Sequence, residues 1–145
     1  MLAWRSPLRL AKSFASTSVA AVPTREQHAV LACEQIRAVP CISENLESIK
    51  RNIIAASSHG ADVVAFPETA LTGYFPDVIQ NADPAVVRVA LQEIAETCGD
   101  AKISAIVGSP VYDDGLIRNS ALVFGPRRAM HLLSHGQSGR GGYLA

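Results

Sequence analysis

The sequence is poor in residues that build covalent or metal-stabilised scaffolds. Its 145 residues include three cysteines, Cys33, Cys41 and Cys98, and no two of them have the CxxC spacing of a zinc or redox motif. An odd number of widely spaced thiols argues against a disulfide framework. His131 and His135 lie four residues apart but lack the glutamate of the zinc-protease pattern. We therefore expect no metal, no other cofactor, and packed thiols in a reducing compartment.

Long apolar runs are also missing. No uncharged apolar stretch reaches the length of about 18 residues that indicates a transmembrane helix. No GxGxxG motif follows an apolar run, so a small nucleotide-binding α/β module is disfavoured. The middle of the chain is acidic and would repel phosphates, and a single SGRGG run is weak evidence for RNA binding. We expect neither a membrane nor a nucleic acid as a partner.

The formal net charge is zero, but the charges are unevenly distributed. Residues 1–25 carry a net charge of +4, residues 26–126 carry −7, and residues 127–145 carry +3. The first segment is basic, rich in serine, free of acids and amphipathic as a helix, which is typical of a mitochondrial transit peptide, a disordered leader being the alternative. The last segment has four glycines and no apolar period, which predicts a flexible tail. We predict a leader at 1–25, a folded domain at 26–126, and a mitochondrial or cytoplasmic location.

The acidic middle alternates short apolar runs with helical periodicity. Helices are predicted from Ser43, as an N-cap, to Gly60, and from the cap Asp83 to Gly99. Residues 113–115 predict a hairpin turn. This alternation indicates an α/β architecture in which helices cover a sheet. Strands are predicted at 29–36 (buried), at 61–66, at 102–107 (ended by Gly108-Ser109-Pro110) and at 117–124.

Glu68 is the candidate site residue that this pattern brings out. It follows the apolar run 61–66 and Pro67, and precedes the turn residues Thr72-Gly73-Tyr74. Functional residues of α/β sheets collect just past the carboxyl ends of strands. A carboxylate in that position is expected to be partly shielded from water and suits a general base near neutral pH. The alternative is that Glu68 merely accepts hydrogen bonds from loop amides, and position alone favours this alternative.

A longer pattern surrounds Glu68. Asn45-Leu46 and Ile49 precede the run GADVVAFPETALTGY at 60–74, and IVGSP at 106–110 and RNSALV at 118–123 follow it. These ordered motifs, over roughly residues 29–125, resemble the nitrilase superfamily of carbon–nitrogen hydrolases. The resemblance implies an α/β fold that is half of a four-layer αββα sandwich, truncated after about four strands. It also implies a Glu–Lys–Cys set that cleaves nitriles, amides or carbamoyl groups, with Glu68 as the base that takes the thiol proton.

The other two members of that catalytic set have no counterpart here. The family carries its lysine and cysteine after the fourth strand, whereas this chain has no lysine after Lys102 and no cysteine after Cys98. We do not expect Lys102, Cys33, Cys41 or Cys98 to substitute, because none is predicted to lie near Glu68. Two hypotheses remain open. The chain is the first portion of a small-amide or nitrile hydrolase, inactive alone and homo-oligomeric when complete, or it is a non-catalytic module that pairs with a full-length homologue.

Overall fold

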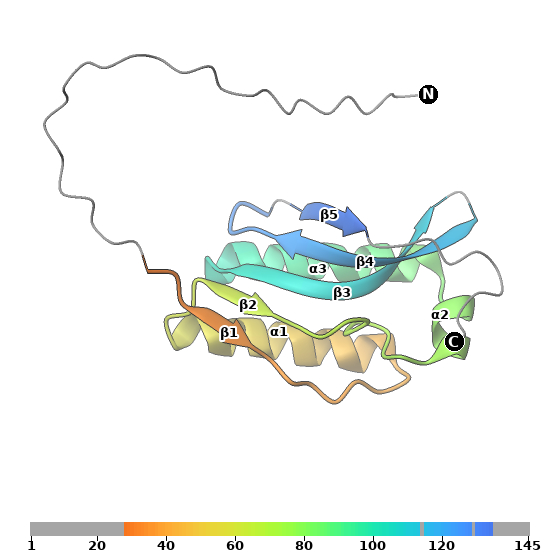
Figure 1. Cartoon of the computed structure of the whole chain (residues 1–145), viewed down its shortest axis with the longest axis horizontal. Helices are drawn as coiled ribbons and strands as arrows, with labels where there is room; N and C mark the ends of the chain where they lie inside the picture. Colours follow the sequence, from red (N-terminus) through yellow and green to blue (C-terminus); the bar gives the residue numbers. More distant parts are fainter. Residues whose placement is uncertain (1–27, 114, 129, 135–145) are drawn as a thin grey trace, which may run out of the picture.

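Five strands form one mixed sheet in the computed structural model, which describes residues 28–134 except 114 and 129. Across the sheet, the first, second and third strands run parallel to one another, and the third, fourth and fifth are each antiparallel to the next. The α/β class is confirmed, while the predicted leader at 1–25 and residues 135–145 lie outside the described residues. In spatial order (Figure 1) the strands are β1 (Leu31–Cys33), β2 (Val63–Ala65), β3 (Ser104–Asp113), β4 (Leu116–Phe124) and β5 (Met130–Ser134).

Two long helices cover one face of this sheet. α1 (Ile42–Ser58) and α3 (Pro84–Ala101) lie side by side behind the strands in Figure 1, and the short α2 (Pro76–Asn81) precedes α3. The apolar stripes of α1 and α3 are buried against alternate residues of the strands, with Val64 and Val107 fully buried. The fold is thus two of the four layers of the predicted sandwich. None of the helices in the described part of the chain has the length and apolar content of a membrane span.

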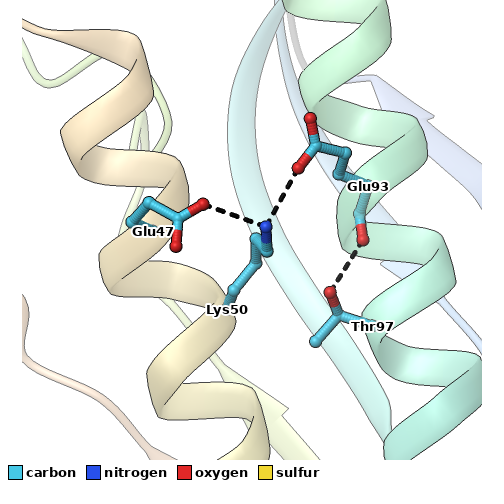
Figure 2. Close-up of polar contacts among 4 residues, drawn as sticks. All are labelled: Glu47, Lys50, Glu93 and Thr97. Atoms are coloured by element: carbon cyan, nitrogen blue, oxygen red, sulfur yellow. Dashed lines mark hydrogen bonds and ion pairs between the residues drawn. The ribbon is translucent and has the colours of Figure 1, made fainter.

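A polar cluster joins α1 to α3 on the outer side of the helix layer (Figure 2). The Lys50 ammonium donates to Glu47 of its own helix at 2.9 Å and to Glu93 of α3 at 3.0 Å. The Thr97 hydroxyl donates to the backbone carbonyl of Glu93 at 2.8 Å. The hydrogen bonds to Glu47 and then to Glu93 raise the pKa of Lys50 above its ordinary value. The Lys50 ammonium links the two helices.

Two of the predicted helix ends are confirmed by the structure, and two are wrong. The Asp83 side chain accepts the Ala85 N–H at 2.8 Å, and Gly60 has the predicted left-handed backbone, with φ of +80°. α1 begins earlier than predicted, however, because Cys41 and not Ser43 is its N-cap. α3 continues through Gly99 to Ala101 and ends at Lys102, which has a left-handed φ of 55°. Lys102 therefore caps a helix and does not begin a strand.

The strands differ more from the prediction than the helices do. The predicted buried strand at 29–36 is the three-residue edge strand β1, in which Leu31 is 58% exposed. The predicted strand 102–107 starts at Ser104 and continues through Gly108-Ser109-Pro110 to Asp113. Pro110 is tolerated because β2 ends opposite Ile106, so beyond that point no strand needs a hydrogen bond from this edge of β3. The predicted hairpin is confirmed, with Asp113 paired to Leu116.

Two further elements were not predicted. Residues 130–134 fall in the segment expected to be a flexible tail, yet they form β5, which pairs with β4 from Ser120 to Phe124. The expectation of a tail beginning at Arg127 is therefore wrong for this stretch, and His131 is an exposed strand residue. α2 begins with Pro76 at its first position, where the missing N–H costs nothing.

Candidate functional site

Glu68 lies at the carboxyl edge of the parallel strands, as predicted. Phe66 extends the pairing of β2 by one residue, since its N–H donates to the Ile106 carbonyl at 2.8 Å. Pro67 has no N–H to continue the ladder, and Glu68 begins the turn formed by residues 68–72. The Glu68 side chain is exposed in the described structure. The expected shielding of this carboxylate from water is therefore not supplied by residues 28–134.

The turn after Glu68 is compact and anchored to the sheet. Thr69 has a left-handed backbone, with φ of 53°, and its hydroxyl donates to the Glu68 carbonyl at 2.7 Å. The Gly73 N–H donates to the Thr69 carbonyl at 2.7 Å, which closes the turn. The Leu71 N–H reaches the Gly108 carbonyl of β3 at 3.3 Å. The backbone that carries Glu68 thus rests on β3.

Gly108 is the residue on β3 that permits this close approach. A Cβ atom at position 108 would lie 2.5 Å from the Pro67 carbonyl oxygen and 2.6 Å from both the Glu68 Cα and the Thr69 nitrogen. Any other side chain would collide with this backbone, so the turn would have to shift away from β3. The sequence predicted Gly108 just after a strand that ends at residue 107, whereas the structure places it inside β3, where a glycine permits the close backbone approach.

Asn119 of β4 holds the Glu68 side chain. Its Nδ2 donates a hydrogen bond to the Glu68 Oε1. Asn119 is paired with Pro110 across β3 and β4, so it projects from the same pair of strands on which the turn rests. The two side chains open onto a cavity of about 270 Å³. Its lining consists of Phe66, Glu68, Ile106, Gly108, Asn119, Ser120 and Ala121.

Asn45 secures the other end of the turn. This side chain is 2% exposed, and its Nδ2 donates to the carbonyl of Leu71 at 3.1 Å and to that of Val39 at 2.7 Å. Its Oδ1 accepts the Val39 N–H at 2.8 Å. The bonds tie α1 to the turn and to the loop before α1. A polar residue within the apolar stripe of α1 was the sequence signal for this role.

The cysteines and Lys102 do not line the cavity. The expectation of packed thiols is wrong for Cys33, which is exposed on β1. Cys41 is the N-cap residue of α1 but makes no side-chain capping bond, and its sulfur lies 3.3 Å from the Ser43 hydroxyl. Cys98 is buried in the core of α3, where desolvation raises the pKa of its thiol to about 11. Lys102 is exposed at the end of α3. Among the described residues, no three His, Cys, Asp or Glu side chains are grouped in a way that could hold a metal ion.

Known proteins share this fold and sequence pattern. Residues 29–138 match the family model described as carbon-nitrogen hydrolase. The chain is 36% identical over 101 residues to the omega-amidase NIT2 of Xenopus tropicalis, and 35% identical over 101 residues to the omega-amidase NIT2-B of Xenopus laevis. Each alignment covers 66% of this chain and 35% of the relative, so the chain spans about a third of the length of these curated relatives.

Solved structures agree on the fold. An amidase from Nesterenkonia sp. superposes with a TM-score of 0.68 at 23% identity, covering 74% of this chain and 42% of the amidase. A variant of that enzyme with an acetamide moiety added covalently at its active-site cysteine gives a TM-score of 0.69 at 22% identity, covering 77% of this chain and 43% of the enzyme. At these identities the likeness shows the fold alone, whereas the family match extends over most of the chain. The chain belongs to the carbon–nitrogen hydrolase family of the nitrilase superfamily.

Proposed function

We propose that this chain supplies the general-base side of an amide-hydrolysing site, with Glu68 as the base. The observation that carries the proposal is the placement of Glu68, which opens onto a cavity at the carboxyl edge of the sheet and is held by an uncharged donor. Membership of the family gives that placement its chemistry, and the named relatives are amidases. Nitriles and carbamoyl groups are the other carbon–nitrogen substrates to be tested.

The geometry suits proton transfer by one oxygen of the carboxylate. Asn119 occupies Oε1, while no hydrogen bond to Oε2 is found among the described residues. In the proposed reaction Glu68 takes the proton of a thiol, and the thiolate sulfur bonds to the amide carbonyl carbon. Glu68 then gives the proton to the leaving nitrogen as the C–N bond breaks. Water, deprotonated by Glu68, cleaves the thioester, releases the acid and restores the thiol.

We propose that the thiol and the oxyanion donor come from residues other than those of this chain. Cys33, Cys41, Cys98 and Lys102 do not line the cavity, and the sequence has no later lysine or cysteine. A cysteine nucleophile is supported by the Nesterenkonia structure that carries an acetamide moiety at its active-site cysteine. The 145-residue chain is accordingly proposed to be inactive alone, as the first portion of a longer hydrolase.

The test compares two polypeptides, each as wild type and as Glu68→Gln. One is the 145-residue chain, and the other is the longest product encoded when the transcript is sequenced past residue 126 in all three frames. Ammonia release from butyramide is expected only from the long wild-type protein, with a loss of about 10²–10⁴-fold in Glu68→Gln because the base is removed. Glu96→Gln, an exposed carboxylate on α3, is the matched control and keeps full activity.

Two outcomes contradict the proposal. Activity of the 145-residue chain that vanishes in Glu68→Gln means that the chain holds a complete site. Full activity of the long Glu68→Gln protein means that Glu68 is not the base. A transcript without a downstream lysine and cysteine in any frame removes the main support for a longer hydrolase.

The second candidate is a non-catalytic module that pairs with a full-length homologue. It is favoured by one observation, that α1 and α3 cover only one face of the sheet. Co-expression with a complete homologue tests it, since a pairing module co-purifies with the homologue and a catalytic portion on its own does not. Import into mitochondria through residues 1–25 is a separate proposal, tested by fusing these residues to a fluorescent protein and locating the fusion in cells.

A further inference from the structure

Glu68 and Asn119 come from parts of the chain that are far apart in sequence. Their side chains are joined by the hydrogen bond from Nδ2 to Oε1 although 51 positions separate them. Glu68 lies in a turn, and Asn119 lies within β4, whose backbone is fixed by pairing with β3 from Leu116 to Phe124. The bond therefore transfers the rigidity of the sheet to a side chain that is otherwise exposed.

The chemistry of the donor is as informative as its position. A hydrogen bond to an ionised carboxylate is stronger than one between neutral groups, so the Asn119 amide favours the orientation of Glu68 in which this bond forms. A lysine or arginine in the same place would stabilise the charged carboxylate and weaken it as a base. An asparagine orients Oε1 without adding charge, and it leaves Oε2 available to the cavity.

We propose that Asn119 is a positioning residue that sets the orientation of the Glu68 carboxylate toward the cavity. This inference rests on the proposed function of Glu68 as the base. Gly108 of β3 lets the backbone of Glu68 rest on the sheet, and Asn119 of β4 holds the Glu68 carboxylate. The two strands of one hairpin therefore position both the backbone and the carboxylate of Glu68. Neither contact involves the groups that complete the reaction.

The hydrogen bond is tested directly by NMR of the 145-residue chain labelled with side-chain ¹⁵N-asparagine. The chain has four asparagines, Asn45, Asn52, Asn81 and Asn119, so the spectrum holds four side-chain amide pairs. In Glu68→Ala the Asn119 pair is expected to move to the position of a solvent-exposed amide, while the other three stay in place. Asn45 reports that the turn is still folded, because it bonds to the same turn. An Asn119 pair that does not move in Glu68→Ala overturns the inference.

The positioning role is tested in the long protein defined above. Asn119→Ala is expected to lower kcat by about 10²-fold, the effect of misplacing a reacting group by about 1 Å, while KM changes little. Asn119→Asp keeps the size of the side chain but cannot donate, and it is expected to lose as much. Asn52→Ala removes an amide that, among residues 28–134, donates to the Ser48 carbonyl of its own helix, and it is expected to keep full activity.

The outcomes separate the two proposals. A long protein that loses activity in Glu68→Gln but keeps its kcat in Asn119→Ala retains the base and excludes the positioning role. A long protein that is unaffected by Glu68→Gln excludes Glu68 as the base. The positioning role of Asn119 is then excluded too, even if the Asn119 amide pair moves in the NMR spectrum of Glu68→Ala.

Discussion

Replacing Gly108 with alanine tests how the turn that carries Glu68 is held on the sheet. Non-bonded carbon atoms pack at about 3.5–4.0 Å, whereas the new methyl group would lie 2.5–2.6 Å from three backbone atoms of residues 67–69. The turn must therefore retreat by about 1 Å from β3. Overpacking of this kind costs about 1–3 kcal/mol. The lower conformational freedom of unfolded alanine offsets about 0.5–1 kcal/mol, which leaves a net loss of between about 0 and about 2.5 kcal/mol.

Gly99→Ala is the matched control, because it adds the same methyl group where the opposite sign is expected. Position 99 lies within α3, where alanine is favoured over glycine by about 0.8–1 kcal/mol. The nearest atom to a Cβ there is the Arg128 Cγ at 2.6 Å, so the exposed Arg128 side chain, which is ion-paired to Asp100, must rotate to accommodate the methyl group. Urea unfolding followed by circular dichroism measures both variants against the wild type. Gly108→Ala as stable as Gly99→Ala would refute the close packing of the turn on β3.

Three further predictions concern the core and the helix layer. Asn45→Ala is expected to lower the free energy of unfolding by at least about 2 kcal/mol in a urea titration, since each buried backbone group left unsatisfied costs about 1–3 kcal/mol; a loss below about 0.5 kcal/mol contradicts the burial of its bonds. Burial raises the pKa of Cys98 from its ordinary 9.0 to about 11, so the stability that the buried neutral thiol contributes is complete below pH 9 and is lost as pH rises toward 11. Cys98→Ala should flatten the decrease of the free energy of unfolding above pH 9. At pH 8 a maleimide should label Cys33 but not Cys98 in the native protein, and equal labelling of the two in a mass spectrum contradicts the burial of Cys98. The pair Lys50–Glu93 lies at the surface, so the coupling between the two side chains in a double-mutant cycle should decrease with added salt. A coupling that salt does not change contradicts a surface ion pair.

Local chemistry was sufficient to predict the two long helices, α1 and α3, but not the short α2 and not all of the helix ends. Asp83 caps α3 because its side chain and the following proline suit a first turn, and both are visible in the sequence. The start of α1 at Ile42 depends instead on Asn45, whose side chain bonds to residue Val39 before the helix. The end of α3 depends on a lysine, Lys102, in the left-handed conformation that glycine usually adopts. The apolar periodicity of a helix does not reveal either of these ends.

The strands show the same limit more strongly. β1 has the composition of a buried strand and is exposed, because it lies at the edge of the sheet. β5 has no strong apolar pattern and forms by pairing with β4. Pro110 reads as the end of a strand, yet it lies inside β3, where the partner on one side has already ended. Strand length here follows from the neighbours in the sheet, which the periodicity of one segment does not reveal.

The candidate site was predictable in part for a related reason. Glu68 follows a strand directly, so its place at the carboxyl edge depends only on local order. The roles of Gly108 and Asn119 depend on the register of β3 and β4 and on the path of the turn over them. The polar run at 118–120 within an apolar strand was the available signal, but its target could not be named before the register was known.

The base assignment of Glu68 is tested most directly by ammonia release from butyramide in the long protein. The kcat/KM of Glu68→Gln is measured against that of wild type, with Glu96→Gln beside it. We predict a loss of about 10²–10⁴-fold for Glu68→Gln and none for Glu96→Gln. A Glu68→Gln protein with the kcat/KM of wild type contradicts the assignment of Glu68 as the base.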